Sequence, residues 1–480
     1  MTMSGEGCAS FFWHDYETFG RFPRKDRPAQ FAGIRTDLDL NEVGEPVMLY
    51  CQPAPDYLPD PESCLLTGIL PQHCLEQGIP EHQFAAAIER ELAAPGTVGV
   101  GYNTIRFDDE VTRHLFWRNL IDPYGREWQN ECGRWDILDL VRAAHALRPE
   151  GIEWPRHEDG RVSFKLEHLT AANGLAHEAA HDALSDVRAT IALAKLIRER
   201  QPRLFDFCLK LRKKDAVLAE IGVGRPFLHI SGMYGPERGC VAIVWPLAPH
   251  PTNRNEIIVW DLAEDPAELL DLRAEDIRAR LFTRTEDLPE GTRRLPIKTI
   301  HINKSPVVVG NLKALSTAQA ERWAVDVGRA LRHAEWTAQH GAKLHGIWPE
   351  VFARPDEARP AVDVDEDLYG GLLSRDDRRA LDRLRSQPPA DLAGRRFGFD
   401  DARLEELVFR WRARNFADTL TADELERWEA HRRDRLLDGA GGALTIERYF
   451  ERIDTLSETA DERGEAILGA LYDYAEQIAP

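Results

Sequence analysis

The first 200 residues alternate between strand-like and helix-like segments. An apolar, aromatic run over residues 11–19 indicates a buried strand, and residues 98–102 indicate a second one. A helical pattern follows directly over residues 108–120, and apolar residues recur at helical spacing over residues 184–197. Strands that alternate with helices predict an α/β layer fold for this part of the chain.

The pattern changes after Gln201–Pro202, a dipeptide that ends the helical run. Short β-like segments over residues 227–230, 241–245, 257–260 and 307–309 predict a small antiparallel barrel or sheet with helical insertions. Residues 353–367 are rich in proline and acidic side chains, which predicts a linker, and the remainder has a helical pattern. The predicted division is therefore an α/β domain (1–200), a β domain (201–352), a linker (353–367) and a helical domain (368–480).

Charge and composition narrow the possible functions. The chain has 61 basic and 81 acidic residues, a net charge of -20, which argues against coating a nucleic acid through overall attraction. Local basic patches and a carboxylate cluster around metal ions remain compatible with this balance. No apolar run reaches the roughly 18 residues of a membrane span, the first eight residues lack a signal-peptide pattern, and the seven cysteines form no C-x-x-C pair. We therefore expect a cytoplasmic protein.

Carboxylates are the strongest candidates for chemistry. Asp15 and Glu17 alternate on the first strand, so both side chains point to one face, which is costly unless a cation neutralises them. A solvent-facing edge strand is the alternative explanation. Asp108 begins a helix and could be only an N-cap. His181 and Asp186 lie five positions apart, which allows one site if His181 precedes the helix.

Residues 177–181 (HEAAH) also match the H-E-x-x-H signature of zinc proteases. Asn173–Gly174 just upstream resembles a helix stop, and Leu184 stands where the extended metzincin pattern has glycine. We interpret this match as a chance occurrence.

The order D-x-E, a later Asp, then H-x4-D resembles the DEDD exonuclease superfamily, histidine subtype. Longer stretches resemble bacterial exodeoxyribonuclease I over almost the whole chain: HDYETFG (14–20), DRPAQFAGIRTD (26–37), GYNTIRFDDEVTR (101–113), RWDILDLVRAAHALRPEGIEWP (134–155), AHDALSDVRATIALAKLI (180–197), QPRLFDF (201–207), HINKSPV (301–307) and RARNF (412–416). The resemblance implies a ribonuclease H-like exonuclease domain, an SH3-like domain and a helical C-terminal domain that form a C-shaped clamp around one DNA strand.

The resemblance also implies the roles of individual residues. Two Mg²⁺ ions, about 4 Å apart and replaceable by Mn²⁺, would bind the carboxylates, and a histidine with an ordinary pKa of about 6.5 would take the proton of the attacking water. The metal ligands would be Asp15, Glu17, Asp108 and Asp186, with His181 as general base and Glu17 also counted as catalytic. DNA contacts would come from Arg113, Tyr124, Trp128, Arg142, Lys165, Lys214, Asn255, Lys298 and His301. Lys165 stands where the family usually has arginine, so its phosphate contact loses the bidentate fork.

The implied activity is degradation of single-stranded DNA in the 3′-to-5′ direction with release of 5′-mononucleotides, in DNA repair and recombination. The implied partner is the acidic, Phe-ending C-terminal tail of single-stranded-DNA-binding protein, with Phe207 and Arg225 as candidate contacts. A monomer is the simpler expectation. Two alternatives stay open: an RNA-trimming exoribonuclease of the same superfamily, and a non-catalytic scaffold for DNA ends.

Overall fold

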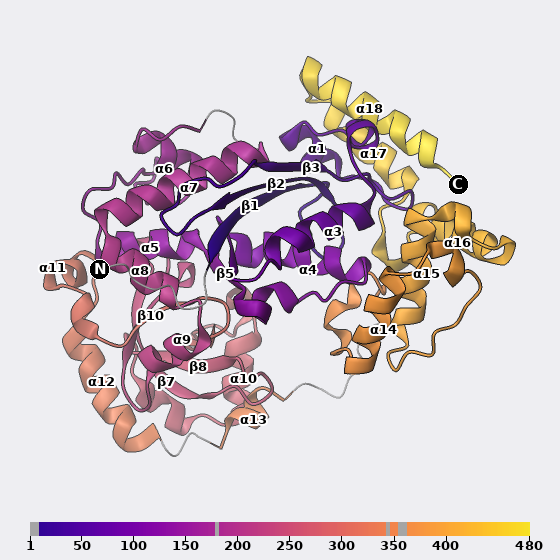
Figure 1. The fold of residues 1–480 in the computed structure, drawn as a ribbon. Helices are drawn as coiled ribbons and strands as arrows, with labels where there is room; N and C mark the ends of the chain where they lie inside the picture. Colours follow the sequence, from indigo (N-terminus) through magenta and orange to yellow (C-terminus); the bar gives the residue numbers. More distant parts are fainter. Residues whose placement is uncertain (1–8, 178–181, 342–345, 354–361) are drawn as a thin grey trace. The chain divides into compact units, whose positions relative to one another are not determined.

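The computed structural model describes residues 9–177, 182–341, 346–353 and 362–480 (Figure 1). The chain divides into two compact units. Unit 1 contains residues 1–133, 177–188 and 360–480, and unit 2 contains residues 134–176 and 189–359. Strand β5 (Gly133–Asp136) and helix α7 (Ala183–Arg200) lie across the division.

Unit 1 contains a sheet that includes the two strands predicted over residues 11–19 and 98–102. The strand order in this unit is β3 (Val47–Tyr50), β2 (Pro28–Thr36), β1 (Ser10–Thr18) and β4 (Thr97–Gly101). Strand β1 is antiparallel to β2 and parallel to β4. On one face, Phe12, Tyr16 and Phe31 pack with residues of α3 (Glu81–Leu92) and α4 (Asp108–Arg118). This core makes β1 the buried strand that its aromatic sequence indicates.

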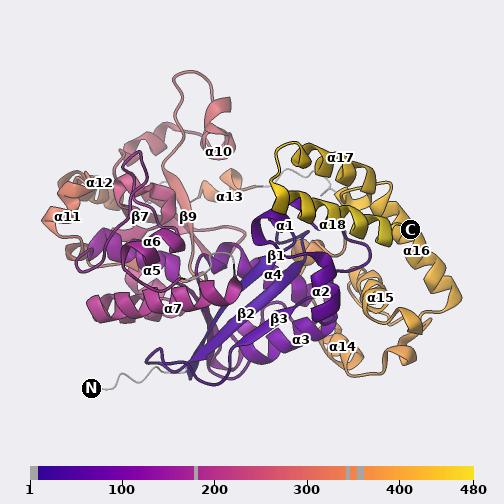
Figure 2. The same ribbon diagram turned by 90° about the horizontal axis from the view of Figure 1, so that it is seen from above.

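The C-terminal helices share cores with the N-terminal residues of the same unit. They are α14 (Arg375–Arg385), α15 (Arg403–Asn415), α16 (Ala422–Leu436), α17 (Ile446–Ser457) and α18 (Glu462–Ile478). Helix α18 contacts α1 (Pro61–Thr67) and α2 (Pro71–Gln77), and the three helices lie together in Figure 2. Trp117 at the end of α4 packs with Leu407 and Trp411 of α15. The C-terminal helices thus belong to the same compact unit as most of the N-terminal α/β residues, although the sequence pattern assigns them to a separate domain.

A buried ion-pair network reinforces this association. Asp365, only 3% exposed, accepts hydrogen bonds from Arg27 (3.2 Å) and Arg414 (2.5 Å), and Arg414 also pairs with the fully buried Asp56 (2.7 Å). Residues 354–361 of the predicted linker lie outside the described residues. The end of that segment, by contrast, is packed into unit 1, because Asp365 has its charged partners there.

Unit 2 is built around a five-stranded antiparallel sheet. Its order is β10 (Val307–Val309), β6 (Phe227–Ile230), β7 (Val241–Pro249), β8 (Glu256–Asp261) and β9 (Ile297–His301). The four β-like segments of the sequence lie in β6, β7, β8 and β10, whereas β9 was not anticipated.

The helices of unit 2 include α5, α6, α8, α9 and α10 to α13. Their bounds are α5 (Ile137–Leu147), α6 (Leu166–Ala172), α8 (Pro202–Lys210), α9 (Lys214–Ile221), α10 (Ala274–Phe282), α11 (Thr317–Arg322), α12 (Val327–His340) and α13 (Trp348–Val351). None of the helices among the described residues combines the length and apolar character that crossing a bilayer requires.

Candidate active site

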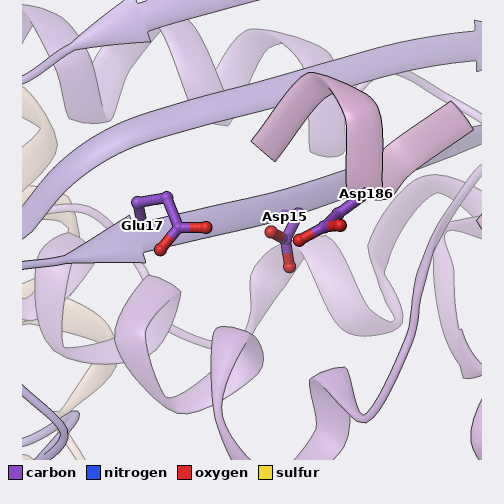
Figure 3. Close-up of side chains that lie close together, drawn as sticks. All are labelled: Asp15, Glu17 and Asp186. Atoms are coloured by element: carbon purple, nitrogen blue, oxygen red, sulfur yellow. The ribbon is translucent and has the colours of Figure 1, made fainter. Parts of the chain in front are cut away.

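Three carboxylates meet at the end of β1. The strand alternation places Asp15 and Glu17 on one face, and Asp186 reaches them from the first turn of α7 (Figure 3). One carboxylate oxygen from each residue lies within 4.8 Å of the others. The structure therefore brings Asp15, Glu17 and Asp186 together, and their role as metal ligands stays a prediction.

Asp108 lies beside this group at the start of α4. Its Oδ1 accepts a hydrogen bond from the backbone N–H of Tyr16 (3.2 Å), the residue between Asp15 and Glu17. The Thr112 hydroxyl donates to the Asp108 carbonyl (2.8 Å), and the Tyr16 and Thr112 hydroxyls lie 3.0 Å apart. These bonds tie the first turn of α4 to β1, so the position of Asp108 depends on the strand that carries the other acids.

The next residue of α4 is held by a buried ion pair. Asp109 accepts a hydrogen bond from Arg126 Nη2 at 2.5 Å, and both side chains are almost completely buried. Burial, followed by the Arg126 charge, lowers the pKa of the neighbouring His14 to about 4. His14 is therefore a neutral packing residue of β1 at neutral pH.

Burial and mutual repulsion perturb the acids strongly. Burial, with added repulsion from Asp108 and Asp186, raises the pKa of Asp15 well above its ordinary value. Burial, followed by the charges of Asp15 and Asp186, raises the pKa of Glu17 to about 9. At neutral pH such a group ionises fully only when a cation neutralises its charge, and an all-oxygen donor set fits hard divalent cations such as Mg²⁺.

His177 also belongs to this site. Its Nε2 lies 2.6 Å from Asp186 Oδ1, and its side chain is almost fully buried. In the sequence, His177 stands out only as part of the zinc-protease pattern, so its contact with Asp186 was not predicted. His181, the predicted general base, lies outside the described residues. Asp182, which follows it, accepts a hydrogen bond from the Ser185 N–H (3.0 Å) and so caps the start of α7.

Three predicted DNA contacts lie in unit 1. Trp128 is 64% exposed, whereas Tyr124 is half-buried beneath the Arg113 guanidinium. Arg113 is buried and donates to Glu127 (2.7 and 2.9 Å), to Glu110 (2.7 Å) and to the Tyr369 hydroxyl (3.1 Å). A direct contact of Arg113 with DNA stays a prediction.

The other predicted contacts lie in unit 2. Lys214 Nζ donates to Asn255 Oδ1 (3.0 Å), and the Asn255 carbonyl accepts from the N–H of Ile302, the residue after His301. Lys214, Asn255 and His301 are therefore brought together. His301 Nδ1 lies 3.5 Å from Glu256, and burial lowers its pKa.

The remaining three cations of unit 2 have different neighbours. Lys298 Nζ donates to the Met233 carbonyl (2.8 Å) and lies 3.9 Å from the centre of the Tyr234 ring. Arg142 pairs with Asp139 (2.7 Å). Lys165 is exposed and pairs with Glu167 (3.2 Å). Their roles in DNA binding stay predictions.

The predicted partner contacts also lie in unit 2. Phe207 on α8 is half-buried. Arg225 is exposed and donates to the carbonyls of Ala219 (2.9 Å) and Glu220 (3.4 Å).

Comparison with known proteins shows the family. Three family models match consecutive parts of the chain: Exonuclease (12–194), Exonuclease I SH3-like domain (212–354) and Exonuclease I C-terminal domain (362–478). Exodeoxyribonuclease I of Escherichia coli (strain K12) is 44% identical over 482 residues, which cover 100% of both chains. The chain belongs to the exodeoxyribonuclease I family.

Solved structures of exodeoxyribonuclease I agree with the fold. Exonuclease I from Methylocaldum szegediense is 49% identical with a TM-score of 0.93, covering 98% of this chain and 100% of that one. E. coli Exonuclease I in complex with a dA16 oligonucleotide is 43% identical, with the same TM-score and the same coverage. The family resemblance and the three domain types inferred from sequence are therefore confirmed.

Proposed function

We propose that this chain is a metal-dependent exodeoxyribonuclease that degrades single-stranded DNA from the 3′ end and releases 5′-mononucleotides. The observation that carries the proposal is the buried cluster of Asp15, Glu17 and Asp186, in a chain similar over its full length to exodeoxyribonuclease I. The dA16 complex of the E. coli relative supports a single-stranded DNA substrate.

Asp15, Glu17, Asp108 and Asp186 would hold two divalent cations, Mg²⁺ by preference and Mn²⁺ as a substitute. When bound, these ions activate the attacking water and stabilise the leaving oxygen of the phosphodiester. The chain itself positions the four carboxylates through β1, the first turn of α4 and the first turn of α7. The raised pKa values of Asp15 and Glu17 in the metal-free protein couple cation binding to release of protons.

We assign the general base to His181, by analogy with the histidine subtype of the superfamily. A neutral imidazole accepts the proton of the attacking water, a function that an ordinary histidine pKa allows at neutral pH. His177 keeps a different role in this proposal, because it contacts the carboxylate of Asp186 and so orients that ligand.

The DNA strand would contact residues of both units. Trp128 and Tyr124 provide stacking faces for bases, and Arg113, Arg142, Lys165, Lys214 and Lys298 provide cations for phosphates. Asn255 and His301 add hydrogen-bonding groups next to Lys214. These are the contacts that would let a chain with a net charge of -20 hold a polyanion.

We also propose binding of the acidic, Phe-ending tail of single-stranded-DNA-binding protein (SSB). A similar solved structure is described as SSB/Exonuclease I in complex with an inhibitor. Unit 2 has an open groove of about 780 Å³ whose apolar lining includes Leu312, Leu315, Val325 and Leu331. Lys313, Glu321 and Asp326 are the charged residues of its wall. Arg225 lies next to Gly310, two residues before Leu312 of the groove. A Cβ on Gly310 would lie 3.2 Å from the Arg225 guanidinium. An apolar slot with nearby cations suits a terminal Phe and its carboxylate. A bacterial enzyme acting on these partners would work in the cytoplasm.

The direct test uses one oligonucleotide labelled at either end, as DNA and as RNA, with Mg²⁺ or with EDTA. We expect degradation of DNA only with Mg²⁺. A 3′ label should be released at once as a mononucleotide, whereas a 5′-labelled oligonucleotide should become progressively shorter. Preferential loss of RNA would favour the exoribonuclease alternative. Binding of DNA without any cleavage would favour the non-catalytic scaffold.

A further inference from the structure

A short loop that connects β1 and β2 is braced by hydrogen bonds of Asp26. Asp26 accepts hydrogen bonds from the Phe22 N–H (2.7 Å) and the Tyr57 hydroxyl (2.9 Å), and its own N–H donates to the Phe22 carbonyl (2.8 Å). Gly20 closes against this carboxylate, because a Cβ there would collide with Asp26. The loop therefore presents the side chains of residues 21–25 in a preorganised arrangement.

These side chains are an aromatic ring among cations. Phe22 is 58% exposed, and the guanidinium of the exposed Arg21 lies 5.8 Å from its ring centre. Arg24 and Lys25 are also exposed, and within the described part of the chain neither forms an ion pair shorter than 4.0 Å. The charge of Lys25 nevertheless favours the ionised form of Glu366. Arg21 pairs with Glu62 (3.2 Å) at the surface, where such a pair contributes little. A local excess of positive charge is unusual in a chain with a net charge of -20.

The loop is close to the carboxylate cluster along the chain and through side-chain contacts. Phe22 follows Glu17 by five residues, so their Cα atoms lie within about 17 Å. The Arg24 guanidinium lies 5.4 Å from the centre of the Tyr369 ring. The Tyr369 hydroxyl donates to Glu110 on α4 (2.5 Å), the helix that begins with Asp108. The loop, Tyr369 and the first turns of α4 thus border one another within unit 1.

We propose that this loop is a further binding site for single-stranded DNA, in which Phe22 stacks on a base and Arg24 and Lys25 neutralise phosphates. An exposed aromatic ring flanked by cations is the combination that single strands bind without sequence preference. The inference rests on the proposed function, because the strand that reaches the loop is the substrate held at the carboxylate cluster. An acidic protein segment would use the cations but would not require the ring.

The test measures affinity without cleavage, in EDTA, for oligonucleotides of about 4 to about 16 nucleotides, which span known single-strand site sizes. Phe22→Ala should weaken binding of the longest oligonucleotide by about 5- to 150-fold, the usual effect of losing one stacked base. The loss should grow with oligonucleotide length. Arg24→Gln with Lys25→Gln should lower the slope of log K against log salt by about 1.4, at about 0.7 for each phosphate contact.

Phe282→Ala is the matched control, since Phe282 is also an exposed phenylalanine (56%) but lies on α10 of unit 2. It should leave affinity and salt slope as in the wild type. An equal loss for Phe282→Ala, or wild-type affinity and slope for the loop variants, would overturn the proposal. Degradation of single-stranded DNA by the wild type distinguishes failure of the loop proposal from failure of the proposed function. If the wild type degrades DNA and the loop variants bind DNA normally, only the loop proposal fails. If the wild type does not degrade DNA, both proposals fail.

Discussion

Glu17→Gln should stabilise the metal-free protein, because the glutamine removes an acid that is costly to ionise. The pKa of Glu17 rises from an ordinary 4.5 to about 9, chiefly through burial and the Asp15 and Asp186 charges. At pH 7 the unfolded protein has released this proton and the folded protein retains it. The difference of about 2.5 pH units, at about 1.4 kcal/mol each, costs the wild type about 3 kcal/mol.

The sign and the pH range follow from the raised pKa. Below pH 4.5 both states hold the proton and the penalty vanishes. It grows as pH rises between 4.5 and about 9, and above that range it is constant, since both states are ionised. The advantage of Glu17→Gln should therefore be small at pH 5 and larger at pH 8.

Thermal unfolding in EDTA at pH 5 and pH 8 measures this difference. At pH 8 the difference is about 3.5 pH units, or about 5 kcal/mol, which for a unit of this size corresponds to a rise in Tm of about 10 °C. Adding Mg²⁺ should reverse the order, because a cation that binds the folded state stabilises the wild type and the variant has lost a ligand. Glu76→Gln, at an exposed glutamate on α2, is the control and should change Tm at neither pH. A Glu17→Gln protein no more stable than the wild type at pH 8 in EDTA would refute the reasoning.

Four further outcomes are expected. Asp186→Ala should abolish cleavage of single-stranded DNA with a normal melting curve, and retention of a tenth of wild-type turnover would remove this residue from the metal site. His177→Ala should weaken Mn²⁺ binding, measured by calorimetry, by about 10- to 100-fold through loss of the contact with Asp186; unchanged affinity would contradict that role. Asp365→Ala should lower the free energy of unfolding by about 3–5 kcal/mol, measured with urea, because it leaves Arg27 and Arg414 buried without this partner; a loss below about 1 kcal/mol would contradict it. Lys214→Gln and Lys298→Gln should each lower the salt slope of DNA binding by about 0.7, and an unchanged slope in both would separate unit 2 from DNA binding.

Local patterns explain what could be predicted about the carboxylates. Alternation along a strand places Asp15 and Glu17 on one face whatever the rest of the chain does, and helical spacing places Asp108 at a helix start. Both features depend on neighbouring residues only. Local patterns do not predict that Asp186 lies close to Asp15 and Glu17. That expectation came from the resemblance to a family in which this order of acids recurs, and in the structure the three carboxylates do lie close together.

Contacts between distant residues could not be predicted in this way. Arg113 was predicted to face DNA, and its pairing with Glu127 and Tyr369 depends on a turn after α4 and on a segment 256 residues away. His177 was dismissed with a chance motif, although it contacts Asp186. Composition also placed Asp365 in a linker, because proline and acidic residues are typical of exposed segments.

The sequence by itself determined the local elements, the shared face of Asp15 and Glu17, and the family. The tertiary structure decided which charges are buried and with which partners. Arg27 and Asp365 are 338 residues apart in the chain, yet they form a buried ion pair. Strand and helix periodicity extends over a few residues, whereas such a pair forms only when the C-terminal helices and the N-terminal residues share one core and exclude water around both charges.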